Sequence, residues 1–179
     1  MSNHSHVATA MRRAMKVFER MPSHGLHEDA TATIVWQGGT RMTACHASGA
    51  SVDTDMPVEL GGGGDCVSPG WLFRSGIGSC AATVIYMTAA LEGIDIDDLE
   101  VQVGSASDTR GVLGMVDADG TRVRPGAAEL QMHIRIGARG VPAARLRALV
   151  DEALRRSSIQ DVMVSHPPVV VQVQPGDRS

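Results

Sequence analysis

The chain has 179 residues, of which 43% are hydrophobic, so it is long enough to fold as one domain around a substantial core. Only 3% are aromatic, so this core must be mostly aliphatic, and a partner subunit often completes a core of that kind. The formal net charge is −4, which leaves no basic face for nucleic acid.

The N-terminal 28 residues have the pattern of an extension attached to a domain. Residues 5–21 carry apolar side chains at helical spacing and charges on the opposite face, which predicts a helix that Pro22 stops. We therefore expect residues 1–28 to form a helical extension and linker, packed on the domain or on a second subunit. Residues 29–179 are expected to form the domain itself.

Three short antiparallel strands are predicted next, over residues 30–36, 41–48 and 50–60. The turns "QGGT" and Gly49 separate them. They lead into four consecutive glycines and Asp65, which we expect to form a flexible loop. The glycines lack the GK[ST] ending of a phosphate-binding loop.

A long helix follows, with Ser68 as its N-cap, Pro69 at its first position and Gly93 at its end. Its apolar residues cover nearly the whole circumference, which is typical of a central, buried helix. Gly76 and Gly78 each cost helix stability of roughly 1 kcal/mol, and a close approach by another backbone would account for them. Cys80 lies just after them.

The C-terminal half alternates between strand and helix patterns. Strands are predicted over residues 97–108 and 128–138, with a loop over 111–126 between them. An amphipathic helix is predicted over 141–158, and a final strand over 167–175. Because runs of strands and helices are segregated along the chain, the sequence predicts an α+β fold and not a parallel α/β sheet.

The three cysteines, Cys45, Cys66 and Cys80, cannot all pair within one chain, and no CxxC motif is present. A reducing cytosol suits this composition best. No apolar leader or membrane-spanning run is evident, so we expect a cytoplasmic protein. Cys45 and His46 are adjacent but lack further ligands at a suitable spacing, so we expect neither a metal nor a cofactor.

Several motifs in order resemble one known family. They are the glycine run, Ser-Pro-x-x-Leu-Phe from Ser68, Gly-Ser-Cys-Ala-Ala-Thr around Cys80, Leu-Glu-Gly-Ile-Asp-Ile from Leu91 and "LEVQV" from Leu99. This pattern is similar to that of the OsmC and organic hydroperoxide resistance family. The resemblance covers about residues 31–174 and is most specific around the cysteine.

The resemblance implies an intertwined homodimer in which antiparallel sheets pack around a long central helix, with two active sites at the interface. It implies thiol-dependent peroxidases of the bacterial oxidative stress response that favour organic hydroperoxides. In that family a peroxidatic cysteine lies on the helix, and a second cysteine near the start of a later short helix forms a disulfide with it. An arginine from the N-terminal strands and a glutamate after the helix-opening proline support the thiolate.

Carried over to this chain, Cys80 matches the peroxidatic cysteine, and Arg41 is the expected arginine. The glutamate position falls at Gly70 and the second cysteine position at Ser157, so both groups are absent. Arg74 is another cation, one and a half turns before Cys80. A nearby guanidinium would offset the rise in thiol pKa that burial causes.

Several interpretations stay open from the sequence. Cys80 is either a small apolar core residue or a peroxidatic thiol that depends on an external thiol for reduction. Cys66 is a candidate for a substitute resolving thiol, from its own chain or from a partner's. The alternative function is a catalytically degenerate protein of the same fold that binds a small hydrophobic ligand at the dimer interface. Catalysis by Ser157 as a nucleophile lacks an evident base.

Overall fold

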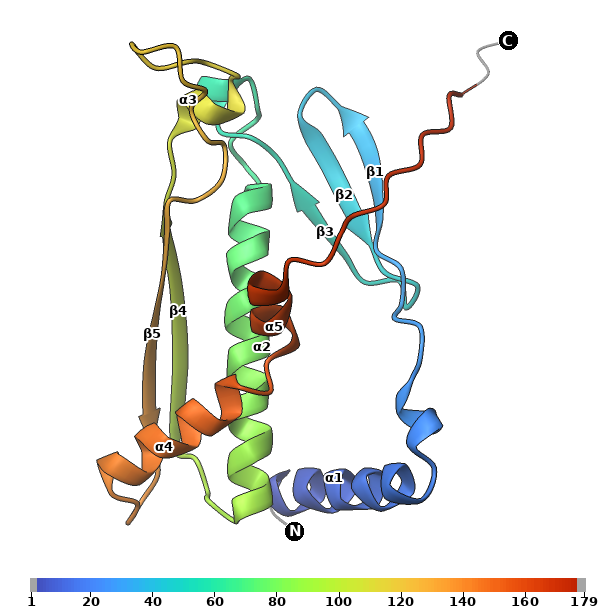
Figure 1. Ribbon diagram of the computed structural model, residues 1–179, viewed down its shortest axis with the longest axis vertical. Helices are drawn as coiled ribbons and strands as arrows, with labels where there is room; N and C mark the ends of the chain where they lie inside the picture. The colour runs from blue at the N-terminus through green and yellow to red at the C-terminus, as the bar shows by residue number, and fades with distance from the viewer. Residues whose placement is uncertain (1–2, 177–179) are drawn as a thin grey trace.

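The computed structural model describes residues 3–176 and has an α+β fold built around one long helix (Figure 1). Its helices are α1 (Asn3–Arg20), α2 (Pro69–Glu92), α3 (Thr109–Val112), α4 (Ala143–Leu154) and α5 (Ser158–Ser165), with short 3-10 turns η1 (Pro22–Gly25) and η2 (Val58–Leu60). Its strands are β1 (Thr33–Gly38), β2 (Arg41–Cys45), β3 (Ser51–Thr54), β4 (Asp98–Ala106) and β5 (Glu129–Gly137). The predicted α+β class is confirmed.

The helix α2 has the ends that the sequence predicts. The Ser68 hydroxyl accepts a hydrogen bond from the backbone N–H of Trp71 at 3.1 Å, which satisfies one of the free amides of the first turn. Pro69 occupies the first turn, where a missing N–H costs nothing. Gly93 ends the helix with a left-handed backbone, φ +71°.

The strands β4 and β5 form an antiparallel pair that packs on one side of α2. Their register runs from Asp98 opposite Gly137 to Ala106 opposite Glu129. A β-carbon placed on Gly78 would lie 3.3 Å from Cγ2 of Val103, so β4 approaches α2 closely at this point. The close approach that the helix glycines predict is therefore confirmed at Gly78.

A separate antiparallel sheet has the order β1-β2-β3 and lies beside the N-terminal end of α2 (Figure 1). Ile34 pairs with Ala44, and Ala44 pairs in turn with Val52. Several large apolar side chains of this sheet are exposed, above all Trp36 at 68%. A sheet of this composition normally buries one face, so its exposure in a single chain is a notable feature.

The buried core lies between α2 and α4. Its α2 members are Ile77, Ala81, Ile85, Ala89 and Ala90, and its α4 members are Leu146, Leu149 and Ala153. The prediction that α2 is buried on all sides is only partly right, because Trp71 and Phe73 are about half exposed. One chain covers the sides of α2 that face β4, α4 and α5, whereas Ser79 and Thr83 are exposed on another side.

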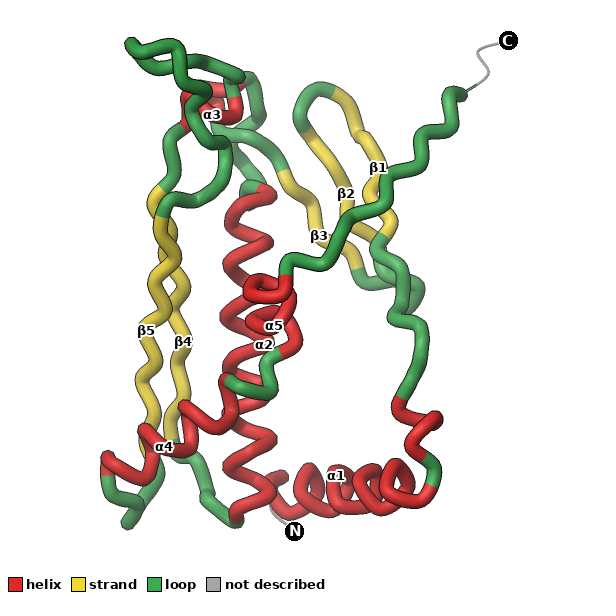
Figure 2. The backbone as a smooth tube through the Cα atoms, viewed as in Figure 1, coloured by secondary structure: helices red, strands yellow, loops and turns green. Residues whose placement is uncertain are grey.

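Two C-terminal predictions are wrong. The helix predicted over residues 141–158 ends at Leu154, and a second helix, α5, begins after a turn. The strand predicted over 167–175 is an arm without regular structure that extends away from α5 (Figure 2). Its valines, Val169–Val171 and Val173, are 76–87% exposed. An extended segment becomes a strand only beside a strand edge, and this arm has no such edge within the described chain.

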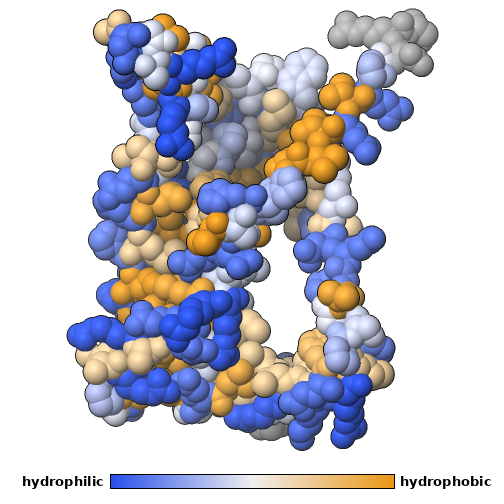
Figure 3. Space-filling model, in the orientation of Figure 1, coloured by the Kyte–Doolittle hydropathy of each residue, from blue (hydrophilic) through white to orange (hydrophobic). Residues whose placement is uncertain are grey.

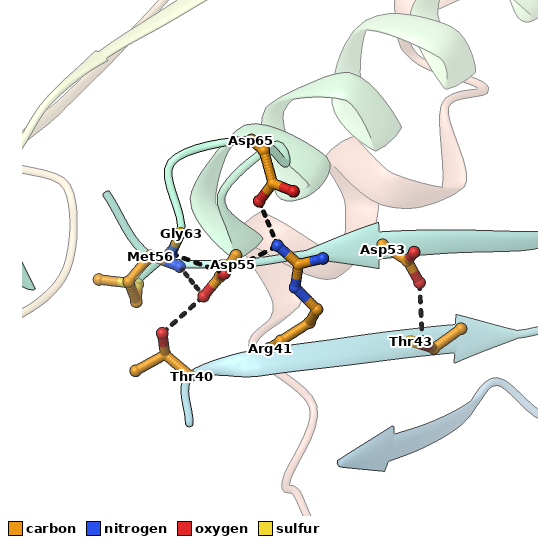
Figure 4. Close-up of polar contacts among 8 residues, drawn as sticks. All are labelled: Thr40, Arg41, Thr43, Asp53, Asp55, Met56, Gly63 and Asp65. Atoms are coloured by element: carbon orange, nitrogen blue, oxygen red, sulfur yellow. Dashed lines mark hydrogen bonds and ion pairs between the residues drawn. The ribbon is translucent and has the colours of Figure 1, made fainter. Parts of the chain in front are cut away.

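The glycine run is not the flexible loop that the sequence predicts. A β-carbon on Gly62 would lie 1.7 Å from the carbonyl oxygen of Met56, so only glycine fits there. The buried Asp55 carboxylate accepts hydrogen bonds from the Gly63 amide at 2.9 Å and the Thr40 hydroxyl at 2.5 Å (Figure 4). Arg41 bonds both Asp55 and Asp65. These contacts fix the loop against the β1–β2 turn.

The helix α1 crosses the C-terminal end of α2 (Figure 1). Ala8 is buried there, and the Arg12 guanidinium donates a hydrogen bond to the Leu91 carbonyl oxygen at 2.9 Å. A cation at a helix C-terminus is favourable to the helix dipole. Beyond this contact Met15 and Phe18 are exposed, and Figure 3 shows an opening through the chain between α1, the segment that follows it and α2. The domain boundary at residue 28 stays a prediction.

Within residues 3–176 we find no helix whose length and apolar character would let it span a bilayer.

Asp55→Asn is expected to destabilise the fold and to change its response to acid. The Thr40 hydroxyl and the Gly63 amide lower the pKa of Asp55 from 3.8 to about 2, against the opposing effect of burial. A carboxylate with a lowered pKa contributes stability fully above its unfolded pKa and loses it as the pH falls through about 2. Urea unfolding of both proteins, from neutral pH down to about pH 2, measures this.

The matched control is Asp53→Asn, because Asp53 is exposed and its carboxylate accepts one bond, from the Thr43 hydroxyl at 2.8 Å. We expect that variant to unfold at nearly the wild-type urea concentration. Equal effects of the two substitutions would contradict the role given to Asp55.

Candidate functional site

Cys80 lies in the middle of α2, where the start of α5 packs against it (Figure 1). Its sulfur is 3.3 Å from the Ser157 hydroxyl oxygen and 3.7 Å from the Ser158 hydroxyl oxygen. Ser157 is 3% exposed, whereas Cys80 is half-buried and open to solvent in part. The thiol therefore has polar neighbours and access from outside, which a simple core residue would not need.

The first turn of α5 directs hydrogen-bond donors at this sulfur. Ser157 is the N-cap of α5, and its oxygen accepts a bond from the Gln160 amide at 3.3 Å. Since that oxygen is already an acceptor, its proton is free to point toward Cys80. The backbone amides of Ser158 and Ile159 also donate toward the sulfur. Free amides and the positive end of the helix dipole both favour a thiolate at this place.

The pKa of Cys80 is lower than that of an ordinary thiol. Burial acts to raise it, but hydrogen bonds from the Ser157 hydroxyl, the Ile159 amide and both donors of Ser158 lower it by more in total. A helix N-terminus is one of the environments that produce reactive cysteines. The groups that lower the pKa of Cys80 are hydroxyls and amides, whereas the sequence predicted a guanidinium.

The structure brings together two of the four residues that the sequence singles out, Cys80 and Ser157. Arg41 and Gly70 lie at the N-terminal end of α2 instead. Gly70 is ten residues before Cys80 on the same helix, about 15 Å along its axis. Arg41 bonds Asp55 and Asp65 beside the glycine loop (Figure 4). A role of Arg41 at the thiolate stays a prediction, and within one chain its bonds are elsewhere.

A cavity of about 750 Å³ lies at the same end of α2. Its wall includes Cys66 and Gly70 together with Leu60, Arg74 and Val112, so it has both apolar and polar surface. A β-carbon on Gly70 would lie 3.6 Å from Arg74 Nη1, an ordinary contact. Burial raises the pKa of Cys66, although the nearby Arg41 guanidinium opposes that rise. The pKa of Cys66 is thus shifted in the opposite direction from that of Cys80.

The remaining sequence candidates do not form a site. Cys45 and His46 lie at the end of β2, where the His46 ring bonds the Ser48 hydroxyl at 2.7 Å. Across residues 3–176, no three side chains of metal-ligating type come close enough together to hold an ion.

The start of α5 is the functional feature that the sequence reasoning missed. Ser157 and Gln160 have the S-x-x-Q spacing of a helix N-terminus, which is a signal that the chain changes direction and starts a new helix there. The signal was hidden by the amphipathic pattern of the preceding segment, which continues without an obvious break up to residue 158.

Comparison with known proteins bears on the fold and the family. A sequence model of the family described as OsmC-like protein matches residues 62–172. No curated protein matches the chain. Similar solved structures include an OsmC-like protein from Mycoplasma pneumoniae, with 18% identity and a TM-score of 0.62 over 78% of this chain and 89% of that one.

Two further structures carry names that refer to activity. An organic hydroperoxide resistance protein, OsmC, from Legionella pneumophila has 19% identity and a TM-score of 0.53, over 77% of this chain and 90% of that one. An organic hydroperoxide resistance protein from Elizabethkingia anophelis has 20% identity and a TM-score of 0.56, over 77% of this chain and 89% of that one. At these identities the likeness is one of fold.

Ser157→Ala is expected to raise the pKa of the Cys80 thiol, because the hydroxyl that lies 3.3 Å from the sulfur is removed. The measurement is the ultraviolet absorbance of the thiolate against pH, in a Cys45→Ser, Cys66→Ser background so that only Cys80 titrates. Ser158→Ala is the matched comparison, and its effect should be smaller because its oxygen is 3.7 Å from the sulfur. An unchanged pKa in Ser157→Ala would show that the hydroxyl does not stabilise the thiolate.

Proposed function

We propose that this chain, which belongs to the OsmC-like protein family, reduces organic hydroperoxides with Cys80 as its single peroxidatic cysteine. The observation that supports this most directly is the position of the Cys80 sulfur at the start of α5, where hydroxyl and amide donors lower its pKa. Members of the same fold include proteins named for organic hydroperoxide resistance.

The reaction proposed at Cys80 is a displacement on the peroxide. The thiolate attacks one oxygen of the O–O bond, a sulfur–oxygen bond forms and the alkoxide leaves, taking up a proton to become the alcohol. Cys80 is left as a sulfenic acid. A lowered thiol pKa increases the fraction of sulfur in the attacking form at neutral pH.

The reductant proposed is an external thiol. Ser157 lies against Cys80, where a cysteine side chain would be within reach of the sulfenic acid, but a hydroxyl cannot form a disulfide. A first external thiol condenses with the sulfenic acid, releasing water and giving a mixed disulfide. A second external thiol then releases Cys80 and leaves as the external disulfide.

A homodimer is part of this proposal. One chain leaves Trp36 of β1 and Trp71 and Phe73 of α2 exposed, together with the valines of the C-terminal arm. Exposed apolar surface of this extent marks an interaction surface. A second copy is the partner that a self-complementary, mostly aliphatic fold would use.

A second candidate function rests on the cavity at Gly70. A chain of this fold that has given up peroxide chemistry would use the 750 Å³ space and its apolar wall for a small hydrophobic ligand. The absence of a side chain at Gly70 leaves this space open.

Cys80→Ser is expected to reduce hydroperoxide consumption to the uncatalysed rate, because the attacking sulfur is gone. The assay is loss of cumene hydroperoxide in the presence of excess dithiothreitol. Cys45→Ser is the control and should retain the wild-type rate, since Cys45 lies at the end of β2, outside the site. A wild-type rate in Cys80→Ser would exclude Cys80 as the nucleophile.

If the binding function is the correct one, native mass spectrometry of the purified protein should show an added mass from a bound apolar molecule. Gly70→Leu should then weaken or remove that mass, because the leucine side chain would extend from the wall into the cavity. An unmodified mass in both proteins, together with hydroperoxide consumption by the wild type, would exclude this second candidate.

A further inference from the structure

The peroxidatic site of one chain contains no second thiol, yet the chain holds another thiol in a defined place. Cys66 is half-buried and lines the open 750 Å³ cavity. Cys45, by contrast, lies at the end of β2, and its sulfur is directed at the Thr43 carbonyl oxygen of the same strand. Cys66 is therefore the sulfur to consider as the capturing group for a Cys80 sulfenic acid.

Cys66 cannot reach Cys80 of its own chain. Cys80 is eleven residues after Pro69, the first residue of α2, which is about 16 Å along the helix. The segment before α2 is fixed, because Thr54 forms a bridge with Val67 and the Asp55 amide donates to the Val67 carbonyl oxygen at 3.0 Å. Asp55 also holds Gly63. Loop movement large enough to close this distance would break the buried Asp55 contacts.

The surfaces around the two thiols are those that one chain leaves uncovered. The β1–β3 sheet exposes Trp36, and the side of α2 that leads toward Cys80 exposes Phe73. Phe73 is seven residues before Cys80, so the two side chains lie on the same stripe of the helix. When a second copy packs its β1–β3 sheet over this stripe of α2, its glycine loop comes to the same place. The reason is that Arg41 of β2 links that loop to the sheet through Asp65.

A twofold axis makes this arrangement reciprocal. In an isologous dimer each copy presents the same two patches, so the loop of one chain meets α2 of the other, and the reverse. Both sites are then completed at once, each from two chains.

From this geometry we infer that Cys66 of a second copy is the resolving thiol for Cys80, so that the oxidised protein is a disulfide-linked dimer. This rests on the proposed peroxidase function. It replaces the first external thiol in that scheme by a thiol of the protein itself.

The chemistry balances with the hydroperoxide as the oxidant and an external dithiol as the final reductant. The Cys80 thiolate takes an oxygen from the hydroperoxide and releases the alcohol, which leaves a sulfenic acid. The Cys66 sulfur of the second copy attacks the Cys80 sulfur, the sulfur–oxygen bond breaks, and the hydroxyl leaves as water with the Cys66 proton. An external dithiol then reduces the disulfide and is itself oxidised.

The different environments of the two sulfurs agree with these roles. At Cys80, burial acts to raise the pKa, but hydrogen bonds to the sulfur lower it by more. At Cys66, burial raises the pKa. The sulfur that must attack first is the one whose pKa is lowered, and the sulfur that must wait for a sulfenic acid is the one whose pKa is raised.

The test is oxidation of the full chain with a stoichiometric amount of cumene hydroperoxide, followed by non-reducing electrophoresis and peptide mapping. We expect a covalent dimer linked from Cys80 to Cys66. Cys66→Ser should abolish this dimer, and a sulfenic-acid trap should then label Cys80. Cys45→Ser is the matched control and should form the covalent dimer as the wild type does.

Mixing two variants makes the test specific for the second copy. Neither Cys66→Ser nor Cys80→Ser alone forms the link, but the mixture, after subunit exchange, should give one Cys80–Cys66 disulfide between chains. A monomer with an internal disulfide, or a wild-type protein whose Cys80 is trapped while no covalent dimer forms, would overturn the inference and leave the peroxidase proposal intact. No labelling of Cys80 in any variant would overturn both.

Discussion

The constraint on which the rest of this structure depends is the apolar character of α2 on all sides. Because the helix has almost no polar face, β4, α4 and α5 pack along it and α1 packs against its C-terminal end. The β4–β5 pair approaches so closely that a β-carbon on Gly78 would lie 3.3 Å from Cγ2 of Val103, and α4 completes the core. In one chain Trp71 and Phe73 of α2 stay about half exposed. Apolar side chains of the β1–β3 sheet are exposed in the same way.

The candidate site follows from this arrangement. A sulfur on a fully apolar helix would have a raised pKa, because nothing there would favour its charge. The start of α5 changes that environment by placing a hydroxyl 3.3 Å from Cys80 and free amides beside it. Ser157 thus caps a helix and supports a thiolate at the same time. The position that the family resemblance assigns to a disulfide partner is therefore a serine in this chain, and its hydroxyl lies against the Cys80 sulfur.

The sequence predicted the elements whose signals are local. Ser68, Pro69 and Gly93 set the ends of α2 because capping depends only on neighbouring residues, and the alternation in β5 predicted a strand that is present. Features that depend on distant contacts were missed. The glycine run looks mobile until Asp55 is seen to hold it, and the arm after α5 has the pattern of a strand without a neighbour to make it one. For the site, Cys80 and Ser157 were identified through the resemblance, but the donors of α5 depend on how two segments 77 residues apart pack together.

The C-terminal arm has a consequence for the newly synthesised chain. Val169, Val170, Val171 and Val173 form a short, uncharged, β-branched run with unpaired backbone groups, which is the composition of segments that nucleate cross-β aggregates. Pro167 and Pro168 precede the run and Pro175 follows it, and proline cannot donate to a strand ladder. These prolines limit the aggregation-prone segment to a few residues. The exposed run is therefore a place where aggregation of the newly synthesised chain can start.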